Sequence, residues 1–185
     1  MRLVKRGGGA LYWSATAEYY DVAGAAERTG SRQLALTRRY ARLVPVRVDD
    51  RIVYREEPFT GTANPGDVLS VRLIAAGSRD WRYLVIEDPL PAGVEAIQDD
   101  TAYPLEQPGA RWWGSRVEYR DQQTVFFQEA FTEGRYEYQY LVRVISSGEF
   151  RARPAQIAPM YVPDITASSA PLELRVPVAA EGTRR

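Results

Sequence analysis

The sequence of 185 residues contains no cysteine and no histidine. Without cysteine there is no disulfide, no thiolate nucleophile and no sulfur ligand for a metal. Without histidine there is no Ser-His-Asp triad, no imidazole ligand and no ordinary general base near neutral pH. Most common hydrolytic chemistries are therefore excluded, and we predict no catalytic residue, no metal site and no cofactor.

An excess of charge of either sign is also missing, because Lys and Arg together number 24 and Asp and Glu together also number 24. Such a balance provides no field that would gather phosphates or an anionic membrane, so we predict no nucleic-acid partner. The start "MRLVKRGGGALYW" is basic but lacks the apolar region of a signal peptide, and no apolar run is long enough to span a membrane. We therefore predict no direct membrane insertion, for a cytosolic protein or for a segment of a larger exported one.

The pattern that dominates the chain is alternation with a period of two, which indicates half-buried β-strands. In "DVLSVRLI", Leu69, Val71 and Leu73 lie opposite Ser70 and Arg72. The strongest run is "RYEYQYLVRV", and its predicted buried face consists of Tyr136, Tyr138, Tyr140, Val142 and Val144. Other runs predict buried faces made of Leu11, Trp13, Ala15, Ala17 and Tyr19; Trp81, Tyr83 and Val85; Val117 and Tyr119; Val125 and Phe127; and Leu172, Leu174 and Val176.

Turn signals rich in proline, glycine, asparagine and aspartate separate these runs, for example "NPGD" at 64–67 and "PLPAG" at 89–93. Many short strands at this spacing predict an all-β fold, an antiparallel β-sandwich with little helix. The only helix-friendly segment is "DVAGAAERTG", which its glycines limit to a turn or two. We predict one sandwich domain over residues 10–177, with frayed extensions at 1–9 and 178–185.

Charged clusters offer candidate sites, but each has a simpler structural interpretation. Acid pairs stand at 49–50, 56–57, 87–88 and 99–100. Adjacent strand residues point to opposite faces, and Asp before Pro or Gly is ordinary turn chemistry, which disfavours a catalytic or Ca²⁺ site. The arginines of "RRYARLVPVR" are more typical of a solvated strand face than of a binding patch. They are Arg38, Arg39, Arg42 and Arg47.

Two adjacent tryptophans, Trp112 and Trp113 in "GARWWGSR", are a candidate ligand-stacking site. Exposed aromatic rings in β-sandwich binding modules stack on sugars. Because strand neighbours face opposite ways, one ring in the core and one at the rim explains the pair equally well. Both interpretations stay open.

Taken in order, several segments resemble the C-terminal macroglobulin-like domain of the bacterial α2-macroglobulin family. The most specific combination is the "DPLPAG" turn, the "YEYQYLVRV" strand, the Gly-Glu-Phe corner and "PAQIAPMY". The resemblance covers about residues 10–177 and implies a macroglobulin or immunoglobulin-like sandwich.

What the resemblance implies about function is indirect, because the family traps proteases through a bait region and a thioester in a separate domain. The terminal domain docks onto that thioester domain, and a Met-Tyr loop helps to cover the bond. Met160 and Tyr161 stand where that pair is expected, between Pro159 and Pro163. Some relatives lack the thioester, and in such a parent the two residues would line an ordinary interdomain contact. An apolar lid of this kind keeps water and amines from a thioester carbonyl, and the prolines lower the cost of ordering it.

The resemblance therefore implies a non-enzymatic domain of a broad-spectrum protease inhibitor of bacterial defence. The parent is expected in the periplasm, as a lipoprotein anchored to the inner membrane. The implied partners are the thioester domain and, through the parent, target proteases; a cell-wall synthase is left open as a further partner. Two alternatives use the same fold: an immunoglobulin-like adhesin module, and a carbohydrate-binding module that uses Trp112 and Trp113.

Overall fold

The computed structural model describes residues 6–9, 31, 33–108, 115–162 and 164–178. The described residues form twelve strands and no helix. The strands are β1 (Leu34–Val48), β2 (Arg51–Pro58), β3 (Val68–Gly77), β4 (Trp81–Pro89), β5 (Val94–Ile97), β6 (Ser115–Arg120), β7 (Gln123–Phe131), β8 (Gly134–Val144), β9 (Gly148–Ala152), β10 (Gln156–Pro159), β11 (Ala167–Ser168) and β12 (Leu172–Val176).

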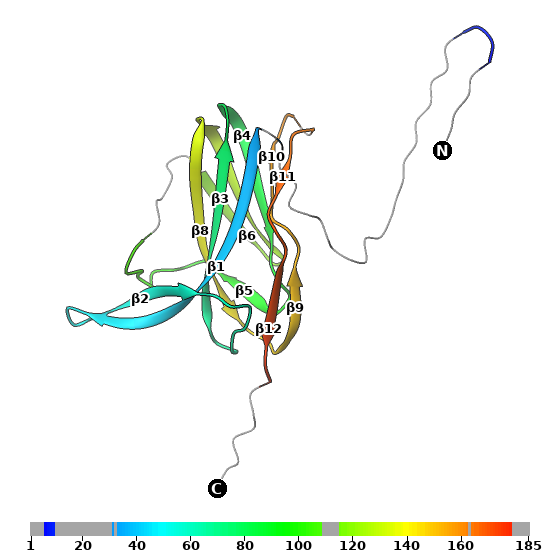
Figure 1. The fold of residues 1–185 in the computed structure, drawn as a ribbon. Coiled ribbons are helices and arrows are strands. Elements are labelled where there is room, and N and C mark those ends of the chain that lie inside the picture. The colour runs from blue at the N-terminus through cyan, green and yellow to red at the C-terminus, as the bar shows by residue number, and fades with distance from the viewer. Residues whose placement is uncertain (1–5, 10–30, 32, 109–114, 163, 179–185) are drawn as a thin grey trace.

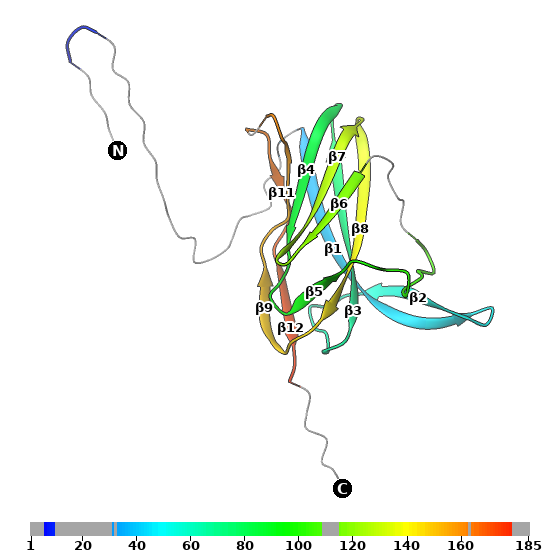
Figure 2. The ribbon, with the colours of Figure 1, turned by 180° about the vertical axis from the view of Figure 1, so that it is seen from behind.

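Two five-stranded antiparallel sheets form the body of the molecule. One has the order β2-β1-β3-β8-β5 and the other the order β11-β10-β4-β7-β6, while β9 and β12 pair separately. Figure 1 shows β1, β3 and β8 nearest the viewer, and Figure 2, from behind, shows β4, β7 and β6. The two sheets face one another, so the predicted antiparallel β-sandwich is confirmed.

The core lies between the sheets and contains the predicted faces of β3 and β8. Leu69, Val71 and Leu73 are fully buried, and the residues of the alternating β8 row from Tyr136 to Val144 are at most 9% exposed. Phe126 of the second sheet reaches across to this row, with its ring centroid 5.2 Å from that of Tyr138. Aromatic pairs at this separation add to the stabilisation that burial alone gives.

The prediction for β4 is wrong in its phase. Trp81 is buried as expected, but Leu84 and Ile86 occupy the core, whereas Tyr83 is exposed and Val85 lies on the outer face. The cause is the backbone of Tyr83, whose φ of 56° is left-handed and interrupts the strand alternation. After Tyr83 the inward positions are therefore the even-numbered ones.

The faces of β7 and β6 also differ from the prediction. Phe126, rather than Phe127, belongs to the core, because it pairs across from Ile86 of β4. Val125 is buried as expected, but it shares the face of β7 opposite Phe126 with the half-buried Phe127. Val117 is exposed because β6 is the edge strand of its sheet.

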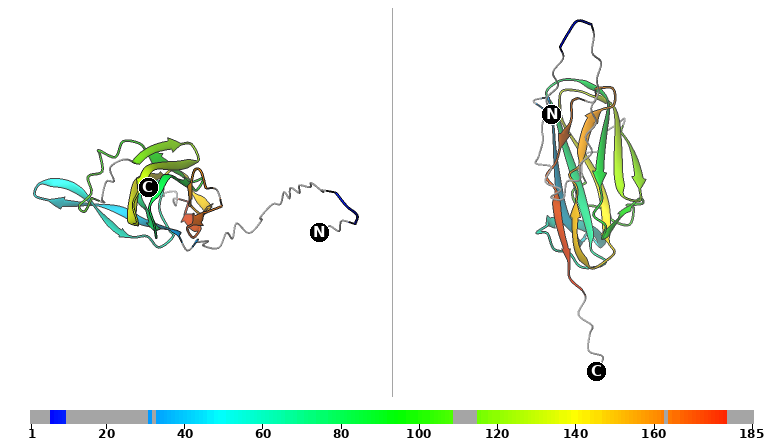
Figure 3. Two further views of the ribbon diagram at one scale, coloured as in Figure 1. Left: turned by 90° about the horizontal axis from the view of Figure 1, so that it is seen from above. Right: turned by 90° about the vertical axis from the view of Figure 1, so that its right-hand side faces the viewer.

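A second small cluster covers the outer face of β3, on the side of the sheet away from the main core. Val68 packs there with Leu43 and Leu141, and Tyr54 and Tyr103 close over them. The cluster lies at the base of the β1–β2 hairpin, which projects from the sandwich (Figure 3). At its tip, Asp49 and Asp50 both have positive φ, as a tight hairpin turn requires.

Several predicted segments lie outside the described residues. They include the strand expected at 11–20 and the helix-friendly segment at 21–30. The sheets run from Leu34 to Val176, within the predicted domain of 10–177. The domain limits and the frayed extensions remain predictions.

Candidate functional site

The candidate site is built around the segment that follows β10. Pairing of β10 with β4, in which Ile157 is opposite Ile86 and Pro159 opposite Leu84, carries the chain to the end of the sheet. Pro159 is buried there, while Met160 and Tyr161 leave the sheet. The amide of Val162 donates to the carbonyl of Pro159 over 3.2 Å and closes the turn. The buried Pro159 therefore holds the start of the turn in place.

Tyr83 of β4 holds this turn from the side. The amide of Met160 donates to the Tyr83 carbonyl over 2.8 Å. The rings of Tyr83 and Tyr161 meet edge to face, with centroids 5.6 Å apart and planes at 86°. The left-handed φ of Tyr83 directs its ring outward, and a strained backbone of this kind often marks a functional site.

Together these side chains expose an apolar surface. Tyr161 is 75% exposed, Met160 51% and Tyr83 41%, and Val162 beside them is also exposed. We call these four residues the Met-Tyr patch. Burying apolar surface stabilises a protein by about 25 cal/mol per Å², and exposed apolar surface lacks this stabilisation. Clusters of exposed apolar side chains therefore often mark interaction surfaces.

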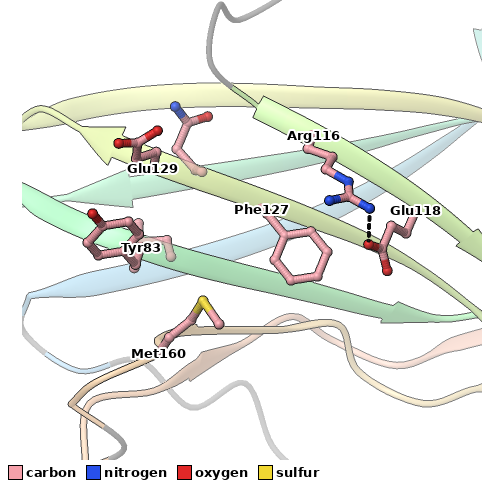
Figure 4. Close-up of a pocket in the computed structure, with 8 residues that line it drawn as sticks. Tyr83, Arg116, Glu118, Phe127, Glu129 and Met160 are labelled. Carbon is pink, nitrogen blue, oxygen red and sulfur yellow. Dashed lines mark ion pairs between the residues drawn. The ribbon is translucent and has the colours of Figure 1, made fainter.

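A shallow depression of about 350 Å³ adjoins the patch on the outer face of β4, β7 and β6. Phe127 and Met160 form its apolar middle, with Tyr83 and Glu129 at one end (Figure 4). Arg116 and Glu118 stand at the other end and form an ion pair of 2.8 Å. The lining combines carboxylates, an arginine, aromatic rings and a thioether, which is the mixture of apolar surface and a few polar groups that is typical of ligand sites.

The structure brings together three of the predicted site residues. Pro159, Met160 and Tyr161 are consecutive at the end of β10, and Pro159 anchors the other two. Pro163, Trp112 and Trp113 lie outside the described residues, so their predicted roles stay predictions.

The sequence analysis missed Tyr83, Phe127 and Glu129 as site residues. The only sequence signal at Tyr83 pointed the other way, because strict alternation assigns its ring to the buried face. Phe127 was assigned to the core by the same rule, and Glu129 has no neighbour in the sequence that marks it as part of a site.

The predicted solvated face holds for Arg39 and Arg47, which are exposed, but not for Arg38. Arg38 is buried in the core, where its guanidinium pairs with the carboxylate of Asp88. The hydroxyl of Tyr140 donates to the same carboxylate over 2.8 Å. Asp88 was assigned to turn chemistry because it precedes a proline, but it lies on the inward face of β4, in phase with Leu84 and Ile86. We call Arg38, Asp88 and Tyr140 the Arg38–Asp88 network.

Burial governs the protonation of this network. It raises the pKa of the Asp88 carboxyl, and Arg38 and Tyr140 offset that shift only in part. It also raises the pKa of Tyr140 well above the usual range, so this hydroxyl remains a donor. The network joins β1 and β8 of one sheet to β4 of the other, and its side chains are almost completely buried, which suits a structural role.

The remaining charged candidates do not form a metal site. In the part of the chain that the structure describes, no group of three or more acidic side chains is placed to hold an ion. The carboxylate of Asp99 accepts from the amide and hydroxyl of Thr101, which lowers its pKa and is ordinary turn chemistry. The described residues also contain no helix of the length and apolarity needed to cross a membrane.

Comparison with protein families gives one match that covers most of the sandwich. The profile of the bacterial alpha-2-macroglobulin MG10 domain matches residues 34–164, which is more than half of the chain. An alpha-2-macroglobulin homolog of Nostoc sp. is 31% identical over 115 residues, or 60% of this chain. The chain spans only 6% of the length of that relative.

Solved structures share the fold. The native conformation of alpha-2-macroglobulin from Escherichia coli superposes with a TM-score of 0.67 over 86% of this chain and 10% of its own, at 22% identity. Salmonella alpha-2-macroglobulin reacted with methylamine gives 0.65 over 84% of this chain and 10% of its own, at 20% identity. In both proteins the matching region is a small part of a much longer chain.

Proposed function

This chain belongs to the family of bacterial alpha-2-macroglobulin MG10 domains, and on that premise we propose that it is the C-terminal domain of a protease-trapping protein and acts by docking, not by catalysis. Its partner in this proposal is the thioester domain of the same parent chain. Because the sequence has no cysteine, the thioester must be supplied by that other domain.

The observation that carries the proposal is the contrast within the Met-Tyr patch between exposure and restraint. Tyr161 is 75% exposed, yet its ring rests against Tyr83, and the backbone of Met160 is hydrogen bonded to β4. Large apolar side chains that are held in place without being covered have already lost part of their freedom, which lowers the entropic cost of binding. This arrangement suits a surface that another domain covers.

The chemistry of a thioester explains why such a cover is useful. Its carbonyl is attacked by water and by amines, so it survives only where both are kept away. An aromatic plate beside a flexible thioether adapts to an uneven surface and excludes both. Met160 and Tyr161 supply these two side chains, and Tyr83 positions them. The Salmonella relative is described as reacted with methylamine, which provides the assay.

The test is the rate at which methylamine releases the free thiol from the complete parent protein. We expect Tyr161→Ala to speed that release, because the cover over the carbonyl loses its largest ring. The matched control is Ile52→Ala, which removes another exposed apolar side chain from the β1–β2 hairpin, away from the patch. Equal rates in wild type and Tyr161→Ala would refute the lid role.

Membership of this family also suggests where the parent protein is located and what it does. We propose a broad-spectrum protease inhibitor of bacterial defence, located in the periplasm and anchored to the inner membrane as a lipoprotein. Target proteases reach this domain only through the parent, and a cell-wall synthase is a further proposed partner. Fractionation of source cells, with an antibody to this chain, tests the location: a band far above 20.9 kDa in the envelope fraction is expected.

A further inference from the structure

One end of the depression beside the Met-Tyr patch combines an aromatic ring with a carboxylate. In the pairing of β4 with β7, Arg82 is opposite Ala130 and Leu84 opposite Gln128, so Tyr83 and Glu129 lie across from each other. Both side chains are exposed, and Figure 4 shows them at the same end. A ring face and a carboxylate in one place attract the same kind of group, a cation.

The carboxylate of Glu129 differs from the other acid of the depression in its charge balance. Glu118 is held by two arginines, Arg116 at 2.8 Å and Arg120 at 2.9 Å. Glu129 forms no ion pair within the described residues, and neither Arg116 nor Arg120 reaches it. The arginine end of the depression therefore carries a net positive charge, while Glu129 at the Tyr83 end keeps a negative charge without an ion-pair partner among the described residues.

The space between the two ends is apolar. The ring of Phe127 and the thioether of Met160 face it, and Met160 belongs at the same time to the Met-Tyr patch (Figure 4). A ligand that fits both parts has a long aliphatic stem and a cationic head. Lysine and arginine side chains have this shape, since they lay their methylene groups on apolar surface and keep the charge at a polar rim. An acidic side chain would be repelled by Glu129.

We infer that this depression receives a lysine or arginine side chain from the surface that covers the Met-Tyr patch. The inference rests on the proposed docking function and adds the chemistry of the partner. The stem lies on Phe127 and Met160, and the charged head meets the Glu129 carboxylate beside the ring of Tyr83. Glu129 thus fixes the register of docking, because a surface that buries the patch without a cation here leaves this carboxylate desolvated and unpaired.

Oxidation of Met160 by hydrogen peroxide tests the inference, since the thioether reacts only while it is uncovered. The rate is followed by the mass of the peptide that contains residue 160, in this chain alone and in the complete parent. In this chain Met160 is 51% exposed, which sets the fast reference rate. If wild-type parent reacts at that rate, the patch is not covered, and both the docking function and the present inference are wrong.

Variants of Glu129 then separate the two proposals. We expect Glu129→Gln to speed oxidation in the parent about two- to fivefold, the range for a partly solvated ion pair. We expect Glu129→Arg to speed it about tenfold or more, because two like charges then meet. The control is Glu133→Arg, which places the same charge at the exposed β7–β8 turn. The variants should leave the rate in this chain alone unchanged.

Two results would overturn the inference and leave docking intact. In the first, Met160 is protected in the wild-type parent and equally protected in both Glu129 variants. In the second, Glu133→Arg exposes Met160 as much as Glu129→Arg does, which would reflect net charge and not a specific contact.

Discussion

Two regions of this sandwich invert the usual distribution of side chains, and one strand contributes to both. Inside, β4 contributes Asp88, which is fully buried with Arg38. Outside, β4 contributes Tyr83, which is exposed beside Tyr161. The charge is in the core and the aromatic ring is on the surface. Side-chain type alone therefore did not decide position; the phase of β4, shifted at Tyr83, did.

The two regions differ in whether their side chains have interaction partners within the described residues. In the Arg38–Asp88 network each charge has its partner, and the hydroxyl of Tyr140 adds a further donor. In the Met-Tyr patch the apolar rings are fixed in place but have no cover within the described residues. Buried polar groups without partners are costly, so the paired network is expected to stabilise the fold, whereas the exposed apolar patch is the surface that we propose for docking. Changes in the first should unfold the chain, and changes in the second should not.

The largest effect is expected from Asp88→Ala, which leaves the Arg38 guanidinium buried without a counter-ion. Breaking a buried pair in this way destabilises a protein by about 3–5 kcal/mol. The free energy of unfolding is measured by urea denaturation, with Glu129→Ala as an exposed acidic control that should change it by less than about 0.5 kcal/mol. A loss below about 1 kcal/mol for Asp88→Ala would show that the core tolerates a lone guanidinium, contrary to the rule for buried ions.

A smaller loss is expected from Tyr140→Phe, which keeps the ring and removes only the hydroxyl. The hydrogen bond to the Asp88 carboxylate is 2.8 Å long, and bonds to charged groups contribute about 1.5–3 kcal/mol. Tyr138→Phe is the matched control, because its hydroxyl donates to the neutral amide oxygen of Gln128 over 3.2 Å. Urea denaturation should give a lower free energy of unfolding for Tyr140→Phe than for Tyr138→Phe. The reverse order would contradict a larger contribution from the hydrogen bond to the charged acceptor.

The strained backbone of Tyr83 predicts an unusual order of stability between two small residues. A left-handed φ costs a residue with a Cβ about 1–2 kcal/mol and costs glycine almost nothing. We expect Tyr83→Gly to unfold at a higher urea concentration than Tyr83→Ala. Two residues later, at the regular position of Val85, the order should reverse, with the glycine variant less stable than the alanine variant by about 0.5–1 kcal/mol. The same order at both positions would contradict the strain at Tyr83.

The smallest effect on stability is expected from Tyr161→Ala in this chain alone. The ring is mostly exposed, so its loss should change the free energy of unfolding by less than about 0.5 kcal/mol. Thermal unfolding followed by circular dichroism gives the comparison with Tyr140→Phe. A destabilisation as large as that of Tyr140→Phe would mean that Tyr161 serves mainly to hold the end of the sandwich together.

The success of the period-two rule depended on the regularity of each strand. The alternation of "RYEYQYLVRV" placed Tyr136, Tyr138 and Tyr140 in the core, and they are there. The same rule failed in β4, because one left-handed residue shifts the faces and leaves no mark in the pattern. The charge pattern misled for Arg38 and Asp88. Each looked like a surface charge, since their pairing joins residues fifty positions apart.

The candidate site divides in the same way. Met160, Tyr161 and Pro159 could be proposed from the sequence, because they are consecutive and belong to one motif. Tyr83, Phe127 and Glu129 were not found, because they come from β4 and β7 and meet only through sheet pairing. Nothing local to these three residues distinguishes them from other exposed positions on a strand.

The sequence by itself determined the fold class, the turns and the apolar character of the Met160–Tyr161 loop. Period-two alternation and turns with proline depend only on a few neighbouring residues. The absence of cysteine and histidine likewise limits the chemistry in any fold that the chain could adopt. Only the tertiary structure decided that Asp88 is an internal counter-ion and that Tyr83 completes the Met-Tyr patch. The physical reason is that charge pairing and apolar coverage depend on distances between strands, and those distances are set when the sheets come together.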